Sequence, residues 1–436
     1  MTKPEHGNFL ELFQQFQAEQ SDTEWLDSLR QRGIDRFTEL GFPNHRNEEW
    51  RFTNINPLKS TVFRAATPGT IDDIESELQR VGFHKWPGHR LVFVDGRFAR
   101  DLSATEGLPA DVVVGGLADV MNSDGALARE YLAQNSGLNG NPFTALNTAF
   151  IRDGGFVMIP DGTVLESPIN LIFLTTAPEP TAAVHPRNLI VVGRQSEATI
   201  IESYAGPNDT TYFTNTVTAI VMDDGAVVDH YKVQRESMAA FHIAELNIRA
   251  VDNCRFATHS VSIGGHITRN TINAVLDGEG INCTLNGLYL GTDDQVIDNH
   301  TFIDHAKPHC NSYEIYKGIL DKKAAGVFNG KIYVRPGAQK TDALQTNRAL
   351  LLSDDATINT KPELEIYADD VKCTHGATIG QLDSDALFYL RSRGIDEATA
   401  KGILTYAFAC EAVTDVRIDA IHEEVEAILM SRFRDE

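Results

Sequence analysis

The residues Cys373-Thr374-His375 place a thiol and an imidazole two positions apart in a segment with strand-like alternation. In a strand, such side chains point to the same face, with their alpha carbons roughly 7 Å apart. Both residue types bind iron and zinc, but two ligands do not complete a tetrahedral site. A four-iron cluster usually needs four thiolates. The pattern predicts either a metal site completed from elsewhere, in this fold or another chain, or a buried cysteine beside a hydrogen-bonded histidine.

A second group of candidate ligands lies upstream, at His300, His305, His309 and Cys310. His305 and His309 are four positions apart, which places them on one face only in a helix. Pro308 lies between them and disfavours a helix. We therefore expect structural roles for these four residues rather than joint metal binding.

The five cysteines are widely spaced, and no Cys-x-x-Cys pair occurs in the sequence. This spacing is not that of a disulfide framework, a zinc ribbon or a ferredoxin. Any cluster on this chain would therefore need ligands that the chain does not supply as a local motif.

The sequence gives weak support to two classes of enzyme, nucleotide hydrolases and carbohydrate-active enzymes. Residues 326–331 superficially resemble a phosphate-binding loop, but the segment is one residue short and lacks serine or threonine after its lysine. A β-helix carbohydrate-active enzyme using carboxylates stays open as the alternative function, because such enzymes need convergent carboxylates. Turn-forming roles are favoured for the candidates, which are Asp223, Asp224, Asp293, Asp294, Asp354 and Asp355.

The elements that must position these residues fall into four regions. Residues 1–90 are predicted to form a helical domain, with helical spacing of apolar residues over 8–40 that ends at Gly41. We expect Trp50 and Phe52 to pin the polar loop that follows. Residues 91–155 form a mixed connecting region, with a strand over 91–95 and a helix over 126–135.

Residues 156–382 alternate apolar and polar side chains in short runs, with turn signals of Asp and Gly between them. No helical pattern interrupts these runs, so a βαβ fold is unlikely. A sandwich, a barrel or a β-solenoid would fit the alternation. More than 200 residues of short strands favour the solenoid, because sandwiches are usually smaller.

Residues 383–436 return to helical spacing, with Asp383 or Ser384 and then Asp396 as N-cap candidates. Three amphipathic helices at one end of a solenoid can act as an end cap or as a docking surface. From the residues alone, the end cap is the favoured interpretation.

The composition limits the partners. The sequence has 38 Lys+Arg against 61 Asp+Glu, a formal net charge of −23. Such a surface repels nucleic acid and anionic membranes. There is no charged-then-apolar leader and no apolar run long enough to span a bilayer, so we expect a cytoplasmic protein.

Two long segments, residues 316–334 and 339–383, resemble the SufB/SufD family of iron–sulfur cluster assembly proteins, and residues 46–58 resemble its SufD branch. The resemblance implies a mainly β fold, with a right-handed parallel β-helix between an N-terminal and a C-terminal helical domain. It implies a non-catalytic scaffold of the SUF machinery that pairs with SufB through the β-helix. His375 would act at the SufB interface, with Cys373 beside it, on a transient cluster or iron shared with SufB.

The resemblance further implies that the helices over 383–436 carry the SufC ATPase, so that ATP is used only through SufC. Candidate contacts are Leu390, Arg391, Gly394, Ile395 and Phe408. The family is also associated with a reduced flavin on the assembled complex, although no flavin motif occurs here. A homodimer of the isolated chain stays possible. A SufB-like chain that takes sulfur itself would be longer, with amino-terminal cysteines, whereas the first cysteine here is Cys254.

Overall fold

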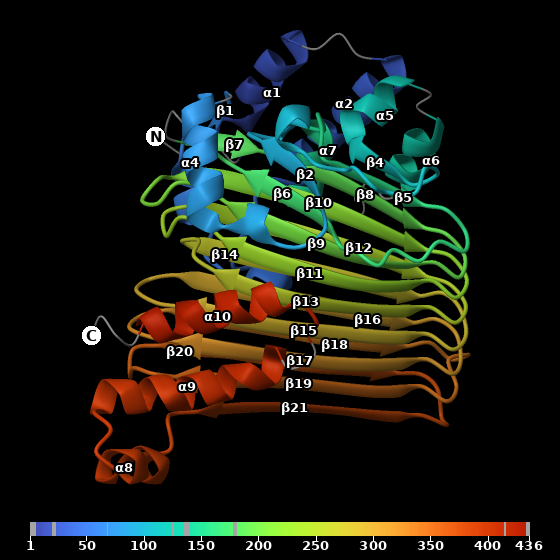
Figure 1. Ribbon diagram of the computed structural model, residues 1–436. Coiled ribbons are helices and arrows are strands. Elements are labelled where there is room, and N and C mark those ends of the chain that lie inside the picture. Colours follow the sequence, from blue (N-terminus) through green and yellow to red (C-terminus); the bar gives the residue numbers. More distant parts are fainter. Residues whose placement is uncertain are drawn as a thin grey trace.

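The computed structural model describes residues 6–19, 23–67, 69–123, 126–134, 140–177, 181–413 and 416–432. Its core is a parallel β-solenoid flanked by helices from both ends of the chain (Figure 1). The described part confirms the predicted mainly β fold with two helical flanks.

Two sheets form the walls of the solenoid, and the chain passes from one to the other in each turn. Sheet A contains β1 (Arg64–Ala65), β4 (Val113–Gly116), β5 (Gly155–Ile159), β7 (Ala182–Val184), β8 (Arg187–Val192), β10 (Tyr212–Met222), β12 (Phe241–Ala250), β14 (Ile267–Leu276), β16 (Val296–His305), β18 (Ala325–Val334) and β20 (Thr357–Ile366). Sheet B contains β2 (His89–Val94), β3 (Arg97–Phe98), β6 (Ile169–Leu174), β9 (Glu197–Ala205), β11 (Val227–Arg235), β13 (Arg255–Ile263), β15 (Asn282–Gly291), β17 (Asn311–Leu320), β19 (Asp342–Leu351) and β21 (Lys372–Gly380).

The alternation in the sequence explains the register. Because successive strand residues point to opposite faces, every second side chain enters the interior and stacks on its equivalent one turn away. Ile220, Ile248, Ala274, Ile303 and Ile332 form one such column across sheet A. All five are buried, and each buried isoleucine contributes roughly 1.5–3 kcal/mol. A slip of one residue would expose the column, so packing fixes the position of the last strands.

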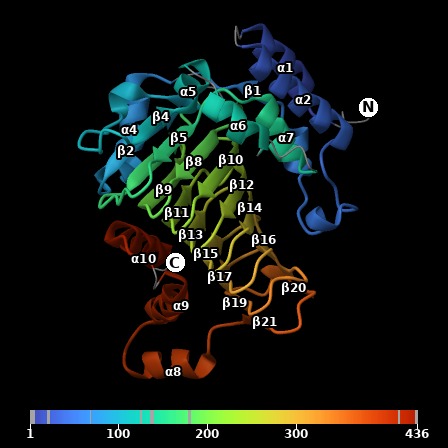
Figure 2. The same cartoon turned by 90° about the vertical axis from the view of Figure 1, so that its right-hand side faces the viewer.

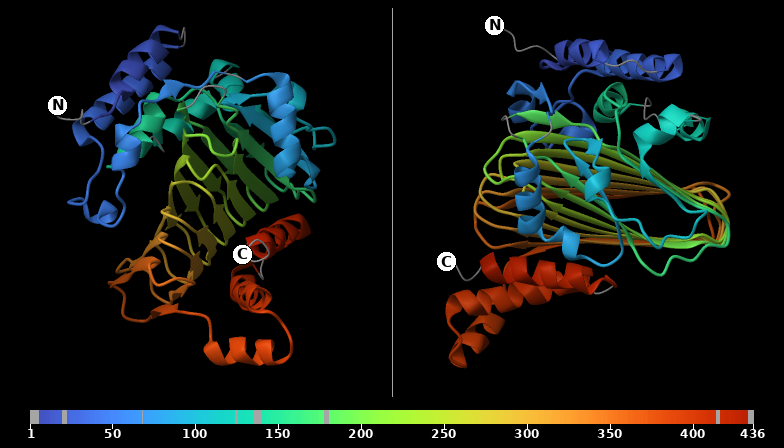
Figure 3. Two further views of the ribbon diagram at one scale, coloured as in Figure 1. Left: turned by 90° about the vertical axis from the view of Figure 1, so that its left-hand side faces the viewer. Right: turned by 45° about the horizontal axis from the view of Figure 1, so that its top comes forward.

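Most of the N-terminal helices gather around the first turns (Figures 1 and 3), whereas the short helix Glu48–Trp50 lies against β14 and β16. They are α1 (Phe9–Ala18), α2 (Glu24–Leu40), α3 (Asn56–Ser60), α4 (Ile71–Val81), α5 (Leu117–Ser123), α6 (Ala126–Gln134) and α7 (Pro142–Ala149), with short 3-10 helices at Glu48–Trp50, Phe83–Lys85 and Arg100–Leu102. Gly41, with a φ of 62°, ends α2 as predicted.

The loop after α2 corrects one expectation. Trp50 is buried and stacks on Arg269, whose guanidinium carbon lies 3.8 Å from the ring centroid. Phe52, however, is 47% exposed. Trp50 alone therefore provides the buried aromatic anchor that was expected from both residues.

The sheets extend beyond the predicted boundary at residue 156. Strand β2 pairs in parallel with β6, and β4 pairs antiparallel with β5. The region 91–155 therefore supplies strands to both walls. The predicted strand and helix there are confirmed as β2 and α6.

The C-terminal helices are α8 (Ser384–Ser392), α9 (Glu397–Val413) and α10 (Asp419–Arg432). Asp383 caps α8, and Asp396 accepts a hydrogen bond from the Thr399 amide at the start of α9. Helices α9 and α10 lie along the outer face of sheet B, and α8 packs on α9 to one side of the last turn rather than over it (Figures 1 and 2). The favoured end-cap interpretation was therefore wrong, and the exposure of β21 agrees with this. No helix in the described residues is long and apolar enough to cross a bilayer.

Candidate functional site

The last turn of the solenoid ends in two edge strands. β20 and β21 terminate sheets A and B, and no further described strand pairs with their outer edges. Side chains of β20 are mostly half-buried, whereas those of β21 are almost all exposed. A long exposed edge presents unpaired N–H and C=O groups that can pair with another chain. We call β20 and β21 together the open end.

Cys373 lies at the start of β21 and is half-buried. Its side chain packs against a small apolar cluster that includes Ile332, Val334 and Ala343. Burial raises the pKa of the Cys373 thiol, and the nearby charge of Asp342 adds to this effect. At neutral pH the residue is therefore mainly a protonated thiol, which is a weaker metal ligand than a thiolate.

His375 lies two residues further along β21 and is exposed. The spacing places it on the same face as Cys373, as predicted for a strand. In register with it on β19 is Gln345, and in register with Gln345 on β17 is Glu314. The structure thus brings the two predicted ligands together at the open end, in front of two buried polar residues that sequence reasoning missed.

The site is incomplete as a metal centre within the described residues. No group of three or more His, Cys, Asp or Glu side chains there is arranged to hold a metal ion. Cys373 and His375 together offer one sulfur and one imidazole nitrogen. An iron ion or cluster bound by them would need additional ligands.

The second group of candidate ligands does not converge. His300 points outward, with its Nδ1 3.0 Å from Glu49 Oε2. His305 is buried, and its Nε2 lies 2.9 Å from Ser312 Oγ. His309 is exposed in a turn, while buried Cys310 donates to the Gly278 carbonyl. His300, His305 and Cys310 each have a partner within the protein, and the structural role expected for the four residues stays a prediction.

The C-terminal helices present an exposed aromatic patch. Phe388 and Tyr389 on α8 are 73% and 57% exposed. Of the predicted partner contacts, Leu390 and Ile395 are half-buried, exposed Arg391 pairs with Glu397, and exposed Gly394 has a φ of 86° after α8. Large exposed apolar side chains that cluster on a surface are typical of protein-interaction sites.

Phe408, the remaining predicted contact, lies against the solenoid. The Lys317 ammonium lies 4.5 Å from the Phe408 ring centroid and donates a 2.7 Å hydrogen bond to its carbonyl. Lys317 also pairs with Glu411 on α9, which pairs with Arg348 on β19. Phe408 and Glu411 therefore anchor α9 to sheet B.

Two family models match the chain. The model described as SUF system FeS cluster assembly, SufBD core domain, matches residues 173–408 and so more than half of the chain. The model of the SufBD protein N-terminal region matches residues 3–171. The chain belongs to the SufBD family of iron–sulfur cluster assembly proteins. This confirms the family predicted from residues 316–334 and 339–383.

Relatives that match over most of their length support the same family assignment. The chain is 36% identical to an iron–sulfur cluster assembly SufBD family protein of Synechocystis, over 93% of this chain and 91% of the relative. It is 31% identical to the iron–sulfur cluster assembly protein SufD of Escherichia coli, over 92% of each chain. With the SufD of Bacillus subtilis it shares 24% identity over 96% of each chain.

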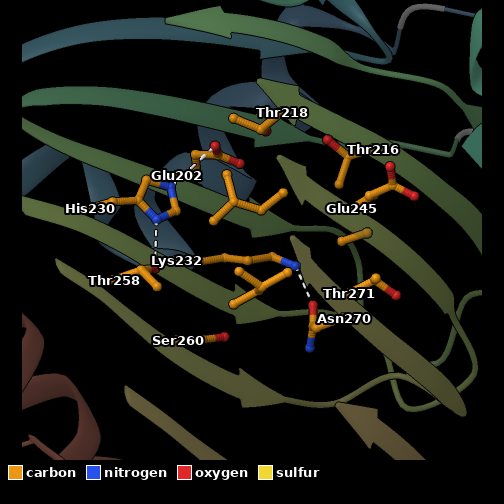
Figure 4. A pocket seen from close by; sticks show the side chains of 13 residues that line it. Glu202, Thr216, Thr218, His230, Lys232, Glu245, Thr258, Ser260, Asn270 and Thr271 are labelled. Atoms are coloured by element: carbon orange, nitrogen blue, oxygen red, sulfur yellow. Dashed lines mark hydrogen bonds and ion pairs between the residues drawn. The ribbon is translucent and has the colours of Figure 1, made fainter. Parts of the chain in front are cut away.

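The interior of this SufBD protein holds a cluster of ionisable side chains that sequence reasoning missed (Figure 4). Lys232 donates to Asn270 and, over 2.9 Å, to His242 Nε2. Burial lowers the pKa of Lys232 to about 8, against the opposing charges of Glu202 and Glu236. The period-2 pattern could have flagged these residues, because it assigns charged side chains to inward positions.

The space beside this cluster is small. The cavity holds about 20 Å³, about the room for one water molecule, and its lining includes Glu202, His230 and Lys232. A sugar or organic acid does not fit there. The cluster therefore forms part of a polar core in this SufBD protein rather than a substrate pocket.

A larger groove of about 800 Å³ lies on the outer face of sheet A. Its carboxylates are already engaged: Glu49 with His300, Glu245 as acceptor from Thr144, and Glu363 with a lysine on its own strand. A glycosidase needs a carboxylic acid and a carboxylate that face the substrate. The groove thus gives no support to the alternative of a carbohydrate-active enzyme, and the turn aspartates lie in exposed connections as expected.

Proposed function

We propose that this SufBD protein is a non-catalytic scaffold subunit that pairs with a SufB protein through the open end of its solenoid. The observation that carries the proposal is the exposed edge strand β21, with Cys373 and His375 on it. A half site at an unpaired edge is completed most simply by a second chain that pairs with that edge.

The surface around the open end supports such pairing. Tyr313 and Leu344 are exposed in adjacent register positions that continue to β21, and Ile379 and Tyr367 are exposed nearby. Backbone pairing between two solenoid ends would supply affinity, and these apolar side chains would add buried area. A homologous partner presents a related edge, so the isolated chain can form a homodimer through the same surface.

His375 would bind iron of the nascent cluster as a neutral imidazole, together with a cysteine of SufB. Cys373 would act as a transient thiol or would pack beside the site, because its raised thiol pKa disfavours a permanent thiolate ligand. The iron and sulfide are cargo that the scaffold hands on. Both chains are then needed for a complete ligand set.

The C-terminal helices would bind the SufC ATPase through the aromatic patch of Phe388 and Tyr389. The contacts that anchor α9 to sheet B would transmit a displacement of this helix to the sheet. A displacement of α9 would pull Lys317 on β17 and Arg348 on β19 through Glu411. Because β19 pairs with β21, the pull would reach the strand that carries His375.

The test replaces His375 by alanine in the complex co-expressed with SufB and SufC. Anaerobic cluster formation, followed by absorbance and iron content, should be lost while gel filtration shows an intact complex. His45→Ala, at an exposed loop histidine far along the chain, is the matched control and should behave like the wild type. Undiminished cluster formation with His375→Ala would remove this residue from the mechanism.

A further inference from the structure

Three side chains follow one another along the interior of sheet B toward the open end. Glu314 on β17, Gln345 on β19 and His375 on β21 occupy the same register position. Glu314 and Gln345 have no exposed surface, whereas His375 at the edge is exposed. Neighbouring strands lie about 4.8 Å apart, so His375 directly follows the Gln345 amide.

The orientation of the Gln345 amide is fixed from behind. Its Nε2 donates a 2.8 Å hydrogen bond to Glu314 Oε2. Burial raises the pKa of Glu314 to about 7, so at pH 8 the group is mainly a carboxylate, which only accepts hydrogen bonds. At that pH the NH₂ end of the amide must face Glu314 and the oxygen must take the other direction. A flipped amide would put two acceptors together at a buried position, which is costly.

The amide oxygen of Gln345 is left without a partner in the described part of the chain, although it is fully buried. Buried acceptors are nearly always satisfied, so an unsatisfied one calls for an explanation. Strand β18, on the facing sheet, has a glycine where it meets this amide. A Cβ at Gly330 on β18 would clash with the amide nitrogen of Gln345.

We propose that Gln345 is a positioning residue for His375: its amide oxygen accepts the N–H of the His375 ring and thereby selects the ring nitrogen that faces the iron. This inference rests on the proposed role of His375 as an iron ligand. In the proposed arrangement, the exposed His375 side chain rotates so that its ring N–H meets this oxygen. Metal-binding histidines usually donate their second ring nitrogen in this way, which fixes both tautomer and orientation.

Glu314 has a supporting part in the same arrangement. By accepting from Nε2, it keeps the acceptor end of the Gln345 amide directed away from itself. An amide at position 314 could either accept or donate, so it would no longer dictate the orientation of Gln345. Glu314→Gln should therefore weaken the effect on His375 without removing it.

The tautomer of His375 can be read directly, without iron or activity. The full chain, labelled with ¹⁵N-histidine, is studied by NMR at pH 8, where an ordinary imidazole is neutral. The His375 signals are assigned by their loss in His375→Ala. We expect one dominant tautomer in the wild type, a mixture in Gln345→Met, and an intermediate ratio in Glu314→Gln. Gln381→Met, at an exposed glutamine just after β21, is the matched control and should keep the wild-type ratio.

Unchanged His375 signals in both Gln345→Met and Glu314→Gln would overturn the proposal. Should Gln345→Met fail to fold, Glu314→Gln alone decides, because it keeps the size and the hydrogen-bonding capacity of the side chain. In the assembled complex, Gln345→Met should lower iron affinity by roughly 10–100-fold relative to Gln381→Met. If His375→Ala leaves cluster formation intact, the proposed function fails, whatever the tautomer experiment shows.

Discussion

The buried carboxyl of Glu314 makes the stability of this protein depend on pH in a definite direction. Burial raises the pKa of Glu314 from 4.5 to about 7, and the hydrogen bond from Gln345 only partly opposes this. The folded state therefore binds a proton that the unfolded chain has already released between these two pH values. Stability is greatest below the unfolded pKa and is lost as pH rises toward and through the folded pKa.

The size of the effect follows from the same values. Because one pKa unit corresponds to about 1.36 kcal/mol, a rise from 4.5 to about 7 costs the ionised folded state about 3.4 kcal/mol. Between pH 5 and pH 8 the free energy of unfolding falls by about 2.5 kcal/mol of this total. Glu314 is fully buried, so solvent does not screen this cost.

The perturbation is Glu314→Gln, and the assay is urea unfolding of the isolated chain at several pH values from 5 to 8. The free energy of unfolding of the wild type should fall relative to that of the variant by about 2.5 kcal/mol across this range. Asp354→Asn makes the same carboxyl-to-amide change in an exposed turn, and its difference from the wild type should stay nearly constant. A Glu314→Gln difference that is independent of pH would refute the interpretation of Glu314 as a protonated core residue.

Two further predictions concern the C-terminal helices. Lys317→Met removes the buried ammonium that holds α9 to sheet B and should destabilise this contact by roughly 1–3 kcal/mol. Hydrogen exchange of the α9 amides should become faster, and protection equal to the wild type would show that Lys317 does not hold the helix. Phe388→Asp should abolish capture of the SufC ATPase and leave the melting temperature unchanged, because the side chain is exposed. Ala427→Asp on the exposed face of α10 is its control, and equal SufC binding by the two variants would move the docking site elsewhere.

The sequence predicts the type of fold well, because alternation is a local property. It could not predict where the solenoid begins. Strand β2 (His89–Val94) pairs with β6 (Ile169–Leu174), and no local pattern links two segments so far apart. The position of the C-terminal helices was also missed. It depends on Lys317, Arg348 and Glu411, whose pairing becomes visible only in three dimensions.

The candidate site, too, could be predicted only as far as local sequence spacing allows. Cys373 and His375 could be found because a spacing of two places side chains on one face of a strand. The partly apolar setting of Cys373 and the exposure of His375 follow from their position on an edge strand, which requires the order of the strands. Gln345 and Glu314 were missed because register relates them to His375 across neighbouring strands, and sequence spacing alone does not reveal register.

The most direct test of the central claim is anaerobic reconstitution with iron and sulfide, carried out on the isolated chain and on its co-expressed complex with SufB and SufC. Absorbance and iron content report the cluster. The shared site at the open end predicts a cluster in the complex and none on the isolated chain. A stable cluster on the isolated chain would contradict it, because the ligands would then be internal, and Cys254, Cys283 and Cys310 would become the residues to mutate.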